Sequence, residues 1–152
     1  CPLVEGCPMS YIAKTAKILD YAKVSGKANV CDRAIVYGYA KVTDKAKVGG
    51  YALVSGYAHV YDNAAIGGNA KVSGIARVSG NAKVLDYAVV WGNADVFGNA
   101  QVYDHAQVGD NARVSGNVRV RGNTNIRNSN LEGDVTISRG WIRDVHWWRE
   151  IP

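Results

Sequence analysis

The sequence predicts an all-β solenoid, in which short parallel strands wind around a thin apolar core. Residues 10–129 repeat every six residues without an insertion, over 20 consecutive hexads. The commonest hexad reads Ala-x-Val-x-(Gly/Asp)-(Asn/Tyr/Lys), as in Ala82-Lys83-Val84-Leu85-Asp86-Tyr87. Self-similarity at one fixed period indicates a repeat architecture and takes precedence over local propensities. Three observations therefore predict this fold class: the period of six, the unbroken run of 20 hexads, and the Ala and Val that stand two residues apart in the commonest hexad.

Each hexad is expected to form one short strand and one turn. Residues two apart on an extended strand share a face, so Ala-x-Val makes a three-residue strand with Ala and Val inward and x outward. The next three positions are rich in Gly, Asp, Asn and Ser, which are turn formers. An amphipathic helix would instead need apolar spacings of three and four. Three strands then close a triangular coil of 18 residues, which makes about six to seven coils over the repeat.

The repeat also resembles a known family. The units Val108-Gly109-Asp110-Asn111-Ala112 and Ile66-Gly67-Gly68-Asn69-Ala70 are similar to those of hexapeptide-repeat proteins, which fold as left-handed parallel β-helices. The resemblance covers about four fifths of the chain. It implies the left hand, which the periodicity alone does not predict, because crossovers between parallel strands are normally right-handed.

The segments outside the repeat are expected to cap it. Residues 1–9 contain two prolines and do not fit the hexad, so we expect an irregular N-terminal cap. After residue 129 the register slips by one, and residues 130–152 form a C-terminal cap or tail. Trp141, Val145 and Trp148 share a helical spacing, which suggests a short helix, and Trp147 lies beside them.

The outward middle residues sort into three faces when every third hexad is taken. One face carries Lys17, Ile35, Leu53, Lys71, Val89, Gln107 and Asn125. The turn beside it adds Tyr21, Tyr39, Tyr57 and Ile75, with Tyr37 and Trp91 nearby. An exposed apolar strip of this kind is typical of a binding surface for a protein partner or for another copy in a dimer or trimer. Two alternatives remain: a stacked aromatic ladder without a partner, or coverage by the tail with Trp141, Trp147 and Trp148.

A second face is basic. It places Lys23, Lys41, Arg77 and Arg113 in one line, interrupted by His59 and Asp95. Such a row could meet the phosphates of a nucleic acid or an acidic protein surface. The aromatic residues lie on another face, which argues against a stacking platform for single strands. With a net charge of +5, the simpler interpretation is a solvated solenoid face.

Catalytic signals are sparse. The family resemblance implies an alternative function, because many hexapeptide-repeat enzymes are acyltransferases with a catalytic His near an extruded loop at a trimer interface. No hexad is interrupted here, so His59 and His105 are only weak candidates for a general base. Related carbonic anhydrases hold zinc with three histidines, two of them close in sequence. His59 and His105 lie far apart on different faces, so we expect no metal and no cofactor.

Composition sets the remaining expectations. No apolar run approaches 18 residues, so no membrane-spanning segment is expected. Cys1, Cys7 and Cys31 match no zinc or redox spacing, and reduced thiols in the cytoplasm are the favoured interpretation over a Cys1–Cys7 bridge. The sequence therefore favours a rigid, non-catalytic module for protein interaction or self-association. Regular arrays of this kind resemble those of uncharacterised bacterial and phage proteins, which implies an inhibitor or adaptor role.

Overall fold

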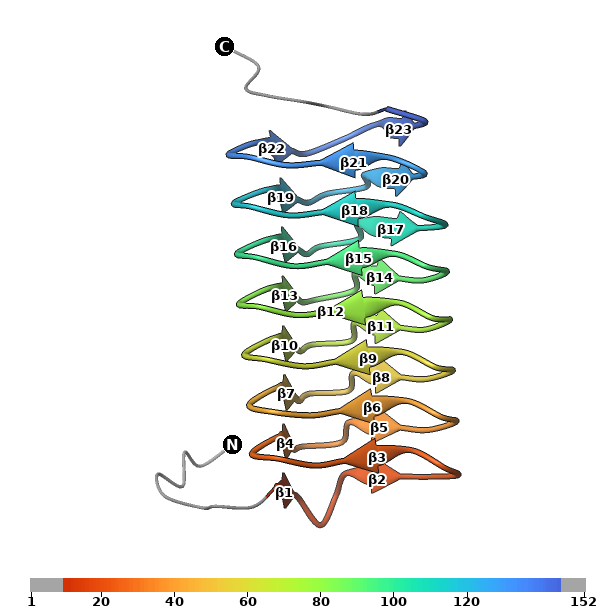
Figure 1. The fold of residues 1–152 in the computed structure, drawn as a ribbon, viewed down its shortest axis with the longest axis vertical. Coiled ribbons are helices and arrows are strands. Elements are labelled where there is room, and N and C mark those ends of the chain that lie inside the picture. Colours follow the sequence, from red (N-terminus) through yellow and green to blue (C-terminus); the bar gives the residue numbers. More distant parts are fainter. Residues whose placement is uncertain (1–9, 146–152) are drawn as a thin grey trace.

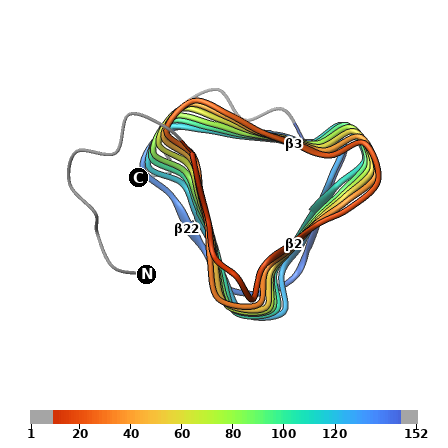
Figure 2. The ribbon, with the colours of Figure 1, turned by 90° about the horizontal axis from the view of Figure 1, so that it is seen from below.

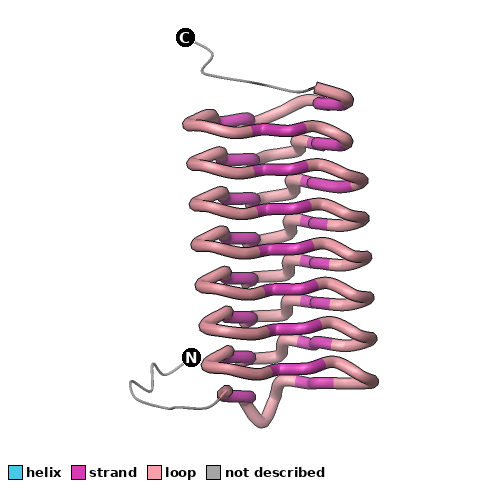
Figure 3. Tube along the Cα trace, viewed as in Figure 1, coloured by secondary structure: helices cyan, strands magenta, loops and turns pink. Residues whose placement is uncertain are grey.

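The computed structural model describes residues 10–145 and confirms an all-β parallel solenoid of about seven turns (Figure 1). No helix occurs within these residues. Figure 3 shows how short the strands are and how much of each coil is turn. Seen from the N-terminal end, the cross-section is triangular, and the chain runs counterclockwise as it recedes from the viewer (Figure 2). The solenoid is therefore left-handed.

Three parallel sheets form the sides of the triangle. The first contains β1 (Tyr11–Ile12), β4 (Asn29–Val30), β7 (Lys47–Val48), β10 (Ala65–Ile66), β13 (Lys83–Val84), β16 (Gln101–Val102), β19 (Arg119–Val120) and β22 (Thr136–Ile137). The second contains β2 (Lys17–Ile18), β5 (Ile35–Val36), β8 (Leu53–Val54), β11 (Lys71–Val72), β14 (Val89–Val90), β17 (Gln107–Gly109), β20 (Asn125–Arg127) and β23 (Trp141–Arg143). The third contains β3 (Lys23–Val24), β6 (Lys41–Val42), β9 (His59–Val60), β12 (Arg77–Val78), β15 (Asp95–Val96), β18 (Arg113–Val114) and β21 (Asn130–Leu131).

Most strands span two residues, one fewer than the hexad pattern predicts, because the alanine belongs to the turn. The N–H of Ala64 donates to the carbonyl of Tyr61, three residues earlier, at 3.2 Å. Its carbonyl accepts from the N–H of Lys47 in the preceding coil at 2.9 Å. Alanine therefore closes the turn with one backbone group and joins neighbouring coils with the other, which satisfies both polar groups in the interior.

The core consists of the predicted alanine and valine columns. From Ala28 to Val120 the inward Ala and Val side chains are completely buried. In the first coils Ala16, Ile18, Ala22 and Val24 are only partly buried and pack against this core. Each inward residue touches its equivalents one coil away, so burial is continuous along the axis and stability accumulates coil by coil.

The Gly/Asp position of the hexad adopts the left-handed backbone conformation at the corners of the repeat. Gly74 has φ +71° and Asp86 has φ +58°. Glycine adopts this conformation without strain, and aspartate tolerates it better than most residues. Several of these aspartates also accept a backbone N–H from the next coil, as Asp104 does from Gly122 at 2.9 Å. These acidic residues therefore serve the turns, as predicted.

The sheets continue beyond residue 129 with shorter coils. Arg113 pairs with Asn130 and Asn125 pairs with Trp141, whereas an unbroken repeat would bring Leu131 and Arg143 to those places. The slip leaves Leu131 buried and turns Glu132 outward, so no charge enters the core. Trp141 lies in β23, so the helix proposed from its spacing with Val145 and Trp148 is wrong for residues 141–145.

Three other predictions concern residues that the structure does not describe. The N-terminal cap at 1–9, Trp147 and Trp148 all fall outside residues 10–145.

Cys31 is disulfide-bonded, which contradicts the expectation of three reduced thiols. The odd cysteine count excluded only a framework that uses every thiol, and it did not exclude a single bridge.

Candidate functional surfaces

The apolar strip lies along the second sheet and the turn beside it. It consists of the outward aliphatic residues of the sheet and the neighbouring turn residues: Ile35, Leu53, Val89, Tyr21, Tyr37, Tyr39, Tyr57, Ile75 and Trp91. Strand pairing places Ile35 beside Leu53, Leu53 beside Lys71 and Lys71 beside Val89. The three aliphatic side chains are half-buried, because each packs against its neighbours one coil away. The register predicted from the repeat is therefore confirmed, while a docking role for the strip stays a prediction.

A tyrosine ladder forms the edge of this strip. The rings of Tyr21 and Tyr39 stack with centroids 5.0 Å apart, and those of Tyr39 and Tyr57 stack at 4.9 Å. Stacking leaves part of each ring in solvent, so Tyr21 remains 68% exposed and Tyr57 63% exposed. The aromatic ladder predicted as an alternative is present, and it still leaves an exposed apolar edge that a partner could cover.

Trp91 is held in place by two later coils. Its indole lies so close to Gly109 that a Cβ atom on that glycine would stand 2.1 Å from Trp91 Cε2. The guanidinium of Arg127 lies 5.1 Å from the Trp91 ring centroid and 5.6 Å from that of Trp141. Cation–π attraction of this kind links the coils at the C-terminal end of the second sheet. The repeat period does not predict the contact of Arg127 with Trp141, because the shortened last coils bring these two residues together.

The basic face is arranged as predicted on the third sheet. Its register runs Lys23, Lys41, His59, Arg77, Asp95 and Arg113 in successive coils. Arg113 Nε approaches Asp95 Oδ2 at 3.9 Å, whereas Lys23, Lys41 and Arg77 form no ion pair within residues 10–145. Lys27, Lys45 and Lys47 are also exposed on the adjoining corner and the first sheet. Positive side chains outnumber negative ones around the N-terminal half of this edge, where Asp44 and Asp62 also lie near His59.

His59 lies half-buried in the middle of the basic row. Its Nε2 is 3.1 Å from the hydroxyl of Thr43, and its ring centroid lies 4.5 Å from that of Tyr61. Burial, followed by the charge of Lys41, lowers the pKa of His59 below its ordinary value of 6.5. A neutral imidazole could accept a proton, and the Thr43 hydroxyl is the side-chain group hydrogen-bonded to its Nε2.

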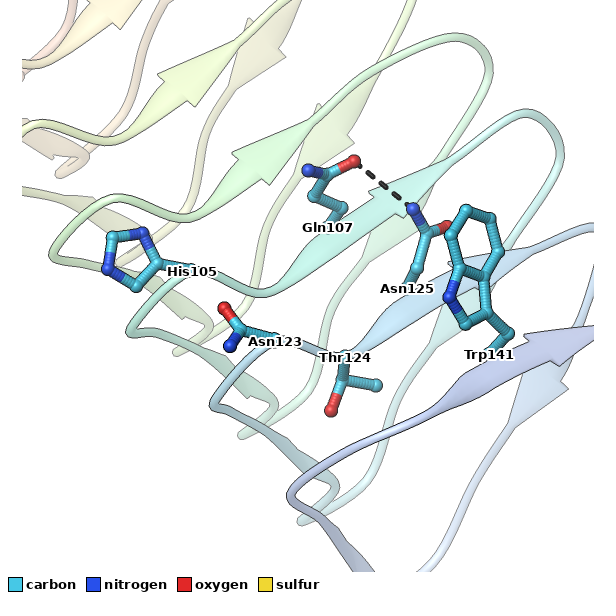
Figure 4. Close-up of a pocket in the computed structure, with 6 residues that line it drawn as sticks. All are labelled: His105, Gln107, Asn123, Thr124, Asn125 and Trp141. Atoms are coloured by element: carbon cyan, nitrogen blue, oxygen red, sulfur yellow. Dashed lines mark hydrogen bonds between the residues drawn. The ribbon is translucent and has the colours of Figure 1, made fainter.

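His105 lies at the corner between the first and second sheets and stacks on Tyr87, with ring centroids 5.1 Å apart. It lines an open depression of about 410 Å³ together with Gln107, Asn123, Thr124, Asn125 and Trp141 (Figure 4). His59, on the third sheet, belongs to a different part of the surface. Among residues 10–145 no group of three His, Cys, Asp or Glu side chains could hold a metal ion.

Comparison with known proteins supports the repeat class. The family model described as the YdcK beta solenoid repeat matches residues 106–122, a segment that includes β17, β18 and β19. No curated protein matches the chain. The match and the fold together support a β-solenoid repeat protein, while the narrower hexapeptide-repeat assignment stays a prediction. In the described part of the chain, no helix has the length and apolar character needed to cross a membrane.

Proposed function

We propose that the protein is a rigid, non-catalytic scaffold that associates through the apolar strip, in the first place with further copies of itself. The observation that carries this proposal is the line of Ile35, Leu53 and, beyond Lys71, Val89 along the second sheet, bordered by an exposed tyrosine ladder. Contiguous exposed apolar surface is typical of interaction sites, and tyrosine suits them because its ring is apolar and its hydroxyl is polar.

The regularity of the solenoid supports a second copy as the occupant. Every coil presents its outward side chains at the same strand spacing, about 4.8 Å along the axis. A second copy of the same straight solenoid therefore matches the strip along its length without a change of shape. Lys17 and Lys71 interrupt the strip, so the second copy must place uncharged or acidic side chains opposite them.

Light scattering on a sizing column tests this proposal. We expect an oligomer for the full chain and a shift to monomer for Leu53→Glu, because a carboxylate at the centre of an interface must lose its hydration, which is costly even with Lys71 beside it. Ala65→Glu is the matched control, since Ala65 is also a half-buried outward residue but lies on the first sheet. A monomeric wild type, or an oligomer that survives Leu53→Glu, would refute self-association through the strip.

The number of subunits measured by light scattering would also decide which experiment follows. A trimer would justify an acyl-CoA binding assay, because the alternative acyltransferase function requires a cleft between subunits that contains His59 or His105. A monomer would direct attention to a foreign protein at the strip, the arrangement that an inhibitor or adaptor role requires.

Polyanion binding is a second candidate function, favoured by the unpaired cations of the basic face. Lys23, Lys41 and Arg77 have no acidic partner within residues 10–145, and further exposed lysines adjoin them. Binding of a duplex DNA probe should then weaken steeply as salt rises. Replacing Lys23, Lys41, Arg77 and Arg113 together by glutamine should abolish it. Retained affinity in this variant would exclude the basic face as the binding surface.

A further inference from the structure

We propose that the depression on the C-terminal half of the second sheet binds a neutral carbohydrate, with Trp141 as the stacking platform and the amides of Gln107 and Asn123 as hydrogen-bonding groups. Figure 4 shows Trp141 beside Asn125 at one end of the depression and His105 near Asn123 at the other. Val89 pairs with Gln107 in the next coil, so the depression begins where the line of Ile35, Leu53 and Val89 ends. Sugar binding rests on Trp141 and the amides and needs none of those three aliphatic residues, but a second copy that covered the whole length of the sheet would compete with the sugar.

The lining of the depression is polar but carries no carboxylate, lysine or arginine. The guanidinium nearest to the lining, that of Arg127, is already engaged by Asn125 and the Trp141 ring, and a cation would find no carboxylate in the lining. Asparagine and glutamine amides both donate and accept hydrogen bonds, as do sugar hydroxyl groups. A neutral polyhydroxylated ring matches this set of side chains better than a phosphate or a cation does.

The hydrogen bonds already present orient the amides. Asn125 Nδ2 donates to Gln107 Oε1 at 3.2 Å, and Asn125 Oδ1 accepts from Arg127 Nε at 3.1 Å. Asn125 is buried and held by both contacts. Because the carbonyl of Gln107 is occupied in this way, its amino group is left to donate outward. No residue within 10–145 bonds to the side chain of Asn123, whose amide is exposed at the rim.

Trp141 supplies the apolar part of the site. Its side chain is 76% exposed, which is unusual for a residue that gains so much from burial. Arg127 lies 5.6 Å from its ring centroid and is itself attracted to Trp91, which restrains the indole. A restrained and exposed aromatic ring offers a surface to the C–H face of a sugar, and the amides beside it are placed to meet the sugar hydroxyls.

The size of the site fits one or two sugar units. A volume of about 410 Å³ lies within the range of roughly 300–1,000 Å³ that small-molecule sites occupy. The depression is open at the surface, so a longer chain of sugars could extend beyond it. Thr124 contributes shape but no free hydroxyl proton, because it is buried and donates to the carbonyl of Arg121 at 2.7 Å.

Saturation-transfer NMR on the full chain tests the proposal with defined probes. The set comprises maltotriose, cellotriose, mannotriose and tri-N-acetylchitotriose, with sialyllactose and adenosine as charged and aromatic comparisons. We expect at least one neutral oligosaccharide to bind with millimolar affinity, and both comparison ligands to bind more weakly. Trp141→Ala and Asn123→Ala should each weaken binding by about three- to tenfold, as expected for one stacking or hydrogen-bonding contact.

Two matched controls separate the site from general surface effects. Tyr57→Ala removes an exposed aromatic ring of the apolar strip, and Asn69→Ala removes an exposed asparagine at the same turn position three coils before Asn123. Both should leave sugar binding unchanged. The proposal would be overturned if no neutral oligosaccharide binds at about 10 mM, if sialyllactose or adenosine binds better, or if Trp141→Ala binds like wild type.

Discussion

Gly109→Ala should destabilise the solenoid because its new methyl group would enter the space of the Trp91 indole. The added Cβ would stand 2.1 Å from Trp91 Cε2 and 2.4 Å from Nε1. The backbone of Gly109 is outside the left-handed region, so an alanine there carries no conformational strain of its own. The ring would have to move away until these atoms reach ordinary van der Waals contact, which begins at 3.4 Å. Arg127, whose guanidinium lies over the same ring, opposes that movement.

Overpacking of this kind typically costs about 1–3 kcal/mol. Urea denaturation followed by far-UV circular dichroism measures the cost without relying on tryptophan fluorescence. A double-mutant cycle with Trp91→Ala isolates the steric contribution, because the smaller side chain leaves room for the methyl group. Gly67→Ala is the control: its Cβ would meet only Leu85 Cδ2, at 3.2 Å, and this flexible side chain can yield.

We expect Gly109→Ala to be clearly destabilising in the wild-type background and nearly neutral beside Trp91→Ala. Gly67→Ala should cost less than about 1 kcal/mol. If Gly109→Ala costs the same in both backgrounds, the clash with Trp91 is not its cause and the reasoning fails.

Two further predictions concern the turns and the pH dependence of stability. Gly74 has φ +71°, and its Cβ would lie 2.8 Å from backbone atoms of Gly92, so Gly74→Ala should lower the urea midpoint. Gly74→Asp should lower it less, because aspartate occupies this position in other coils and can accept the Gly92 N–H, as Asp62 accepts that of Gly80 at 3.0 Å; equal effects would contradict this explanation. Burial and the charge of Lys41 hold the pKa of His59 below 6.5 in the folded chain. Above pH 6.5 His59 is mostly neutral in both the folded and the unfolded state, so it has little effect on stability there. As the pH falls below 6.5, the unfolded state binds the proton more readily and stability declines. The thermal midpoint of His59→Gln should fall less between pH 7 and 5 than that of wild type, and parallel pH profiles would count against this role.

The fold and the composition of its faces could be predicted because the contacts recur at a constant separation in sequence. Ile35, Leu53 and Val89 are separated by whole turns of the repeat, and the structure aligns them as the period requires. The same holds for the stacked pair Tyr21 and Tyr39. The inward burial of the Ala and Val columns follows from their spacing of two on each short strand.

Two features could not be predicted from the period: the length of the strands, which depends on the hydrogen bond made by each alanine N–H, and the contacts made in the last coils. Hydrogen bonding within each turn makes most strands two residues long, which a face-alternation argument does not detect. The shortened last coils bring Asn130 beside Arg113 and Trp141 beside Asn125. Trp91, Gly109 and Arg127 follow the period, whereas the change of register adds Trp141 to this cluster and to the depression next to it.

The sequence by itself therefore determined the solenoid, its core and the composition of its three faces. The tertiary structure decided which outward side chains meet where the period ends, and how the side chains of the turns pair between coils. The physical reason is that a strict repeat converts position in sequence directly into position in space. Once the coil length changes, contacts depend on how the backbone closes each shortened turn, and that is settled by packing and hydrogen bonding between coils.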